Sequence, residues 1–252
     1  MIPNINIPDI ADKFSSLADR VVAAFEESDK DHASTASEPS LLVDAMTRLL
    51  DVFRQMEPKD LHPPAESPNN PLSGRDIHVL GDYGLGLLGE LSAWAGRLQL
   101  AREAEQLEAL TFPLACWIAR QGAELSNLTS VVNSAAALAN SISQPAELER
   151  LYALLGEIVE AVSPQISEDP DKTSASRPWR ILLINRAILA TRSLQPRLMH
   201  EAFQVLVEQL PEEAPQFFRE GMEQMAAIDY PPKIRAVMQQ YYDTWCTPRT
   251  LH

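Results

Sequence analysis

Apolar side chains in this sequence recur every three or four residues rather than every second residue. The segment over residues 8–27 is an example, since its Ile10, Phe14, Val21 and Phe25 fall on one stripe of a helix. Glycine, which the tight turns of β-hairpins need, occurs only nine times in 252 residues. The spacing therefore predicts an all-α protein of about ten amphipathic helices. They are expected over residues 8–27, 39–56, 76–98, 99–120, 124–142, 145–162, 178–193, 196–210, 211–228 and 231–245.

Many of these helices are joined by connections of only a few residues. Short connections favour antiparallel neighbours, so we expect helical hairpins stacked as an α-α superhelix or gathered in a multi-helix bundle. The tetratricopeptide pattern, with small and aromatic residues at fixed offsets before a proline, does not fit. Aligned on Pro211, the pattern finds Met199 where a small residue belongs, and aligned on Pro231 it finds Glu223 in place of the aromatic residue. The sequence therefore indicates helical hairpins without a named repeat family.

Three polar stretches rich in Ser, Pro, Asp and Glu interrupt the helical pattern, at residues 28–37, 57–76 and 163–177. They contain too few apolar side chains to offset the entropy of ordering them, so we expect loops there. The second stretch sets the expected domain boundary. Residues 1–56 form an N-terminal helical hairpin, residues 57–76 a proline-rich linker, and residues 77–252 the main helical domain with a polar loop at 163–177. The sequence leaves open whether the hairpin packs on the main domain.

The chain is acidic, with 35 Asp and Glu against 21 Lys and Arg and a formal net charge of −14. Nucleic acids and anionic membranes carry the same sign, so we expect neither as a partner. No stretch reaches the roughly 18 apolar residues of a membrane span, and residues 1–14 lack the pattern of a secretory signal. Cys116 and Cys246 lie far apart without metal-ligand spacing, which fits a reducing compartment. We therefore expect a cytoplasmic protein.

Residues 84–89, GLGLLG, have the GxGxxG spacing of a dinucleotide-binding loop. That fingerprint also requires a second strand and an acidic residue about 20 positions further on. Residues 100–110 are instead charged and helical in pattern, so no cofactor is expected. The interpretation we favour is a smooth helix face against which another helix packs closely. Its small residues would be Gly81, Gly89, Ala93 and Gly96.

Five arginines and no acidic residue lie between residues 177 and 197, whereas the remaining chain has 16 basic and 35 acidic groups. On a helix, Arg180, Arg186 and Arg192 point about 120° apart, so they cannot share one exposed stripe. This scatter favours ion pairs with several acidic neighbours, because Arg is the usual cation of partly buried pairs. The acidic candidates are Glu157, Glu201, Glu208 and Glu212. The alternative is a site for an anion or a partner, formed by Arg177, Trp179, Arg180 and Arg186.

The sequence lacks the motifs of metal centres and of common catalytic sites. It has no Glu-x-x-His pair, HExxH, GxSxG or P-loop. His78 and Asp82 would share a helix face at i, i+4, and we expect a solvated cluster at a helix start rather than a ligand set. No metal and no catalytic residue are therefore predicted.

Seven of the sixteen aromatic residues lie within the last fifty or so residues. Tyr241 and Trp245 share a face of the last helix and should pack on the preceding helix, whereas Tyr242 lies off that face. Core packing is the expected role of such a stripe. The alternative is an interface, and through it a homodimer, with Tyr241, Tyr242 and Trp245 as candidates.

Together these patterns favour a non-catalytic helical interaction protein, an adaptor or scaffold that binds a protein or peptide. The alternative is a small-molecule or enzyme-like module that binds an anionic ligand near the segment of residues 177–197. A scaffold would expose apolar or charged side chains along its helices. A ligand module would bring two or more arginines together without acidic partners.

Overall fold

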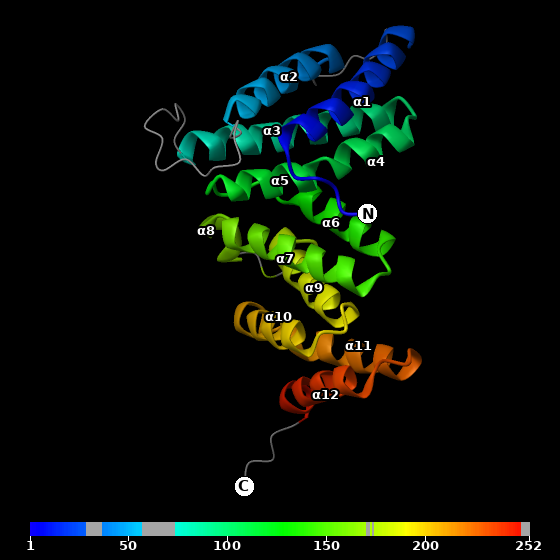
Figure 1. Ribbon diagram of the computed structural model, residues 1–252, viewed down its shortest axis with the longest axis vertical. Coiled ribbons are helices and arrows are strands. Elements are labelled where there is room, and N and C mark those ends of the chain that lie inside the picture. Colours follow the sequence, from blue (N-terminus) through cyan, green and yellow to red (C-terminus); the bar gives the residue numbers. More distant parts are fainter. Residues whose placement is uncertain (29–36, 57–73, 170–171, 173, 248–252) are drawn as a thin grey trace. The chain divides into compact units, whose positions relative to one another are not determined.

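The computed structural model describes residues 1–28, 37–56, 74–169, 172 and 174–247, and these residues form helices without any strand (Figure 1). The prediction of an all-α protein is confirmed. The described helices are α1 (Ile7–Glu27), α2 (Pro39–Met56), α3 (Gly74–Arg97), α4 (Ala101–Ala109), α5 (Thr111–Arg120), α6 (Thr129–Ser141), α7 (Pro145–Ala161), α8 (Pro164–Ser167), α9 (Pro178–Arg192), α10 (Pro196–Gln209), α11 (Ala214–Ala227) and α12 (Pro232–Cys246).

The helix expected over residues 99–120 is two helices, α4 and α5, which separate at Leu110. Pro113 lies in the first turn of α5 and has no N–H to donate to the carbonyl of Ala109. The hydroxyl of Ser134 donates to that carbonyl instead, at 3.3 Å, and the hydroxyl of Thr111 donates to the Glu108 carbonyl at 2.6 Å. Two side chains thus satisfy carbonyls at the break between the helices.

The helix expected to start at residue 124 begins at Thr129. The backbone of Leu125 pairs with the chain that follows α7, since its N–H donates to the carbonyl of Ala161 at 2.8 Å and its carbonyl accepts from the N–H of Ser163 at 2.9 Å. This non-local pairing holds residue 125 outside the helix. The expected polar loop at 163–177 also contains the short helix α8.

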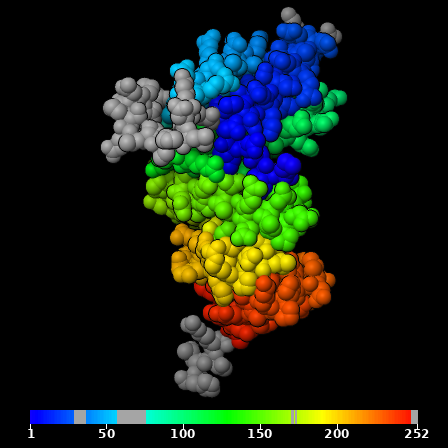
Figure 2. Space-filling view, in the orientation of Figure 1, coloured from blue at the N-terminus to red at the C-terminus, as the bar shows by residue number. Residues whose placement is uncertain are grey.

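The chain divides into two compact units. The N-terminal unit comprises Ile2–Leu138 and Glu160–Glu168, and the C-terminal unit comprises Met1, Ala139–Val159 and Asp169–His252. In the N-terminal unit α1 packs on α2, α3, α4 and α5, and α2 packs on α3. Figure 2 shows the surfaces of α1 and α2 in continuous contact. Helices α1 and α2 therefore pack on the helices that follow them.

The core of the N-terminal unit is apolar and holds fully buried aromatic side chains. Phe14 of α1, Phe53 of α2 and Phe112 of α5 are among them, and the ring of Phe53 lies 4.7 Å from that of Trp117. Of the polar stretches expected to be loops, residues 29–36 and 57–73 lie outside the described residues, whereas residues 74–76 belong to α3.

In the C-terminal unit α9 packs on α10, α11 packs on α12, and α10 also contacts α12. Phe203 of α10 is fully buried and makes edge-to-face contacts with Phe217, Phe218 and Tyr241, with centroids 5.6, 5.2 and 5.1 Å away. Helix α9 is buried over a wide arc that includes Arg186. Its arginines therefore need partners inside the unit.

Within the described chain, none of the helices has both the length and the apolar character needed to cross a membrane.

Candidate functional site

Arg177 lies at the start of α9 and is buried, with only 8% of its side chain exposed. Its Nε donates to Oδ2 of Asp169 at 2.8 Å, and the Asp169 side chain is 6% exposed. Its Nη1 donates to the carbonyls of Lys172 and Ser174 at 3.1 and 2.8 Å. Arg177 thus ties the chain before α9 to the helix start through one carboxylate and two backbone carbonyls.

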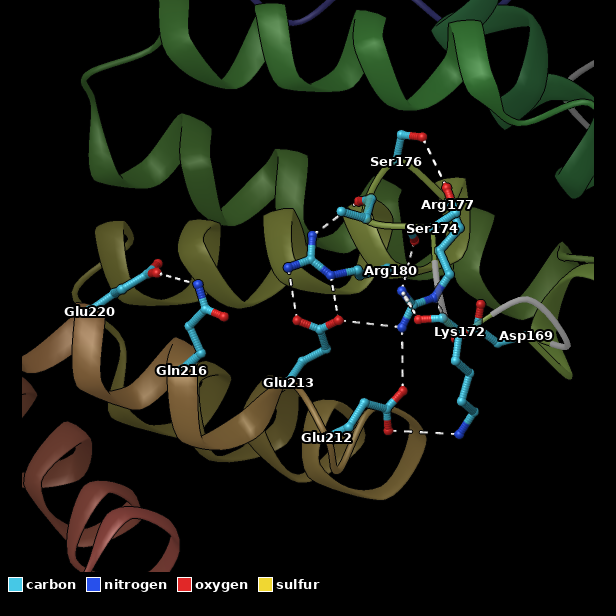
Figure 3. Close-up of polar contacts among 11 residues, drawn as sticks. Asp169, Lys172, Ser174, Ser176, Arg177, Arg180, Glu212, Glu213, Gln216 and Glu220 are labelled. Atoms are coloured by element: carbon cyan, nitrogen blue, oxygen red, sulfur yellow. Dashed lines mark hydrogen bonds and ion pairs between the residues drawn. The ribbon is translucent and has the colours of Figure 1, made fainter.

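The remaining donor group of Arg177, Nη2, reaches the segment before α11. It donates to Oε1 of Glu212 and to Oε1 of Glu213, both at 3.3 Å (Figure 3). A guanidinium has five N–H donors, and the five acceptors around Arg177 account for all of them. Glu212 also pairs with the ammonium of Lys172 at 3.7 Å.

Arg180, one turn further along α9, forms a two-point contact with Glu213. Its Nε lies 2.6 Å from Oε1, and its Nη2 donates to Oε2 at 2.8 Å (Figure 3). The hydrogen bond from Arg180 lowers the pKa of Glu213 and raises the pKa of Arg180. Both groups therefore stay charged over a wider pH range than in isolation.

Arg186 lies two turns into α9 and stacks on Tyr152 of α7, with its Cζ 4.3 Å from the ring centroid. Its Nη2 donates to Oε1 of Glu201 at 3.0 Å, and the Tyr152 hydroxyl donates to the same oxygen at 3.0 Å. Burial, first of all, raises the pKa of that hydroxyl. Gly156 lies beside the guanidinium, and a Cβ there would be in ordinary van der Waals contact with Nη2 at 3.6 Å.

The last two arginines of the segment also have acceptors. Arg192 donates to the carbonyls of Ala139 and Ile142 at 3.0 and 2.7 Å, so it caps the C-terminal end of α6. Arg197 is largely exposed and lies 3.5 Å from Glu201. All five arginines of residues 177–197 thus meet carboxylates or carbonyls of the same chain. The expected pairs with Glu201 and Glu212 are present, and an anion at Arg177 or Arg180 would have to displace a carboxylate.

Some buried donors of α9 have no acceptor among the described residues. They are Nε1 of Trp179, Nδ2 of Asn185 and Nε of Arg186. Trp179 and Arg186 lie seven residues apart and so on one face of the helix. Of the four residues predicted for an anion or partner site, Arg177 and Arg180 are joined through Glu213, whereas Trp179 and Arg186 are buried elsewhere along α9.

His78 and Asp82 of α3 bind the extended segment before α6. Asp82 Oδ1 accepts from the backbone N–H groups of Ser126 and Asn127 at 3.0 and 3.1 Å. Nδ1 of His78 lies 2.8 Å from the carbonyl of Glu124. The expected solvated cluster therefore has a structural role, since it holds the segment before α6 against α3. In the described part of the chain, no three His, Cys, Asp or Glu side chains are grouped so that they could hold a metal ion.

The glycines of α3 lie inside a helix, so the GxGxxG string is not a phosphate-binding loop. The close-packing interpretation is confirmed for Gly81, where a Cβ would lie 2.8 Å from Cδ1 of Ile118. Gly84 packs equally closely on Leu49, which the sequence did not indicate. The interpretation is wrong for Gly96, which has nothing within 4 Å of its Cβ position.

Large apolar side chains are exposed mainly on α2 and α3 of the N-terminal unit. Leu41 and Val52 of α2 are 61% and 38% exposed, and Val79 and Tyr83 of α3 are 60% and 53% exposed. Elsewhere in the described helices, Ile188 is also exposed.

Among the C-terminal aromatic residues, Tyr241 packs on the preceding helix, as the sequence predicts. Its ring lies 5.2 Å from Phe218, its hydroxyl donates to the carbonyl of His200 at 3.3 Å, and burial raises its pKa. Tyr242 and Trp245 are half-buried. An interface and a homodimer through these residues stay predictions.

Sequence reasoning missed Asp169, Glu213 and the stacking partner Tyr152. Asp169 lies in the polar stretch 163–177 and Glu213 at the start of the predicted 211–228 helix, and a single carboxylate in either place carries no periodic signal. Tyr152 could have been found, because it falls on the buried face of the predicted 145–162 helix.

Comparison of the chain with protein-family models, with curated proteins and with solved structures found no match.

Proposed function

We propose that this protein is a helical interaction protein, an adaptor or scaffold that binds a protein or peptide partner without catalysing a reaction. The observation that carries the proposal is the exposed apolar side chains of α2 and α3, namely Leu41, Val52, Val79 and Tyr83. Helices α2 and α3 pack on each other, and exposed apolar groups on neighbouring helices are typical of surfaces that bind another protein.

The charge distribution supports the same proposal. By sequence, the N-terminal unit carries 22 acidic and 10 basic residues, whereas the C-terminal unit is nearly balanced, with 13 and 11. The acidic excess therefore belongs to the unit that holds Leu41, Val52, Val79 and Tyr83, where it would select partners of the opposite sign.

Affinity capture of the full chain from its native cells tests the proposal. The wild type is compared with a variant in which Leu41, Val52, Val79 and Tyr83 are all replaced by Gln, which keeps helix propensity. We expect the wild type to recover one partner protein in an amount nearly equal to that of the wild-type chain itself. The variant should not recover that protein. Recovery of the same proteins by both chains would refute the proposal.

A second candidate function, binding of an anionic small molecule near α9, is favoured by the buried Nε of Arg186, which has no acceptor among the described residues. A carboxylate or phosphate oxygen would satisfy it. Titration with inorganic phosphate and with citrate, followed by the fluorescence of Trp179, tests this function. It requires a saturable change that the Arg186→Met variant lacks, and a flat titration of the wild type refutes binding of these two anions.

A further inference from the structure

We propose that the outer stripe of α3 is a docking surface for an amphipathic helix of a partner protein, whose apolar anchors are flanked by Lys or Arg. The inference rests on the proposed function and specifies its surface and the chemistry of its partner. We define the outer stripe by the residues that face away from the neighbouring helices at alternating three- and four-residue steps. They are Asp76, Val79, Tyr83, Gly86, Glu90, Ala93 and Arg97.

The apolar part of the stripe is its first half. Val79 and Tyr83 lie one turn apart on the same side of α3, and more than half of each side chain is exposed. The exposed face of α1 differs from this stripe in composition. The corresponding stripe of α1 has the same spacing and is exposed throughout, but consists of Asp12, Ser16, Asp19, Ala23 and Glu26.

The second half of the stripe allows a close approach. Ala93 is exposed and extends no further than its Cβ, so the backbone of a partner helix could lie near α3 there, whereas a Cβ at Gly86 would already meet Nδ2 of Asn127 at 3.9 Å. Alternating steps of three and four residues are the spacing of helices that pack side by side. From Asp76 to Arg97 the stripe is about 32 Å long at 1.5 Å per residue, which suits a helix of about 20 residues.

Charge decides which kind of helix fits. Asp76 and Glu90 are exposed on the stripe, and Glu124 is exposed beside His78. At the far end Arg97 lies over the ring of Trp94, 4.9 Å from its centroid. With 22 acidic and 10 basic residues in the whole unit, a basic partner is attracted. A second copy of this chain is repelled.

Photo-crosslinking with the full chain in its native cells tests the proposal. Benzoylphenylalanine is placed at position 83 or 93 of the stripe, at position 41 on α2, or at position 16 on the polar stripe of α1. We expect crosslinks from positions 83 and 93 to one peptide of one partner, in which apolar residues recur at helical spacing between Lys and Arg. Position 16 should give none.

The affinity of that peptide for the full chain, measured by fluorescence anisotropy, supplies the second readout. We expect Val79→Gln with Tyr83→Gln to weaken binding about tenfold or more. Glu90→Lys should weaken it about tenfold at low salt and less at high salt, while the matched Asp19→Lys changes it less than about twofold. Far-UV circular dichroism of each variant reports that the fold is kept.

The failures are distinguishable. Crosslinks from position 41 alone would overturn the α3 surface and leave the proposed function standing. A crosslink to a second copy of the chain, or to an acidic peptide, would overturn the partner chemistry. Absence of crosslinks at all four positions, with no partner in the affinity capture, would overturn both proposals.

Discussion

Removing the guanidinium of Arg177 is expected to destabilise the C-terminal unit by about 3–5 kcal/mol, because it leaves a buried carboxylate without its cation. The pair is buried on both sides, with 8% of the Arg177 and 6% of the Asp169 side chain exposed and 2.8 Å between Nε and Oδ2. Arg177→Met keeps most of the apolar stem, so the loss reports the charge and its hydrogen bonds. Arg180→Met should cost less, about 1–3 kcal/mol, because Glu213 keeps its contact with Arg177.

Urea unfolding followed by far-UV circular dichroism measures the loss of stability, and hydrogen exchange of α9 peptides localises it to the C-terminal unit. A double-mutant cycle with Asp169→Asn isolates the pair. The double variant should be more stable than the sum of the single losses predicts, with a coupling of about 1–3 kcal/mol. A loss below about 1 kcal/mol for Arg177→Met, as exposed ion pairs give, would refute the structural role of Arg177. It would also favour the anion site predicted at that residue.

Four further predictions concern other positions. Glu213→Gln should destabilise the protein at neutral pH. The pKa of Glu213 is lowered in the folded state, so its charge stabilises the fold fully only above the pKa of the unfolded chain, about 4.3. The difference in Tm between the variant and the wild type should therefore shrink as the pH falls below that value. In denaturant unfolding, Gly81→Ala should cost about 1–3 kcal/mol through its clash with Ile118. Gly96→Ala, which meets nothing, should gain about 1 kcal/mol of helix propensity. Asp82→Ala should cost about 1–3 kcal/mol and speed amide exchange over residues 124–128, since two backbone N–H groups lose their acceptor.

Helix positions could be predicted well where local signals define them. The helices starting at Pro39, Pro145 and Pro178 begin at the predicted residues, because proline fits the first turn of a helix. The break at Leu110 was not predicted, since the apolar spacing indicated one helix over residues 99–120. Whether a helix bends or breaks at Pro113 depends on side-chain donors for the freed carbonyls, and Ser134 is distant in sequence.

The acidic partners of the arginines were predictable as a class but not one by one. Glu201 and Glu212 were named correctly, yet Glu213 makes the two-point contact with Arg180, and Glu208 accepts a hydrogen bond from Gln204. The side chains of adjacent glutamates in a turn point in different directions. The path of the backbone decides which of them reaches a given arginine. The sequence pattern therefore predicts that the pairs form without assigning each carboxylate to its arginine.

The net charge of −14 describes neither unit. The five-arginine segment lies in the C-terminal unit, where 13 acidic residues nearly balance 11 basic ones and where Arg177, Arg180 and Arg186 are matched to carboxylates. The unmatched acidic charge belongs to the N-terminal unit. Ion pairs in the C-terminal unit use their charges to hold α9 in place, and this leaves little net field for a partner. The N-terminal unit has a net negative field, and the exposed apolar side chains of α3 lie in that field. We therefore propose the partner surface there rather than at the five arginines of residues 177–197.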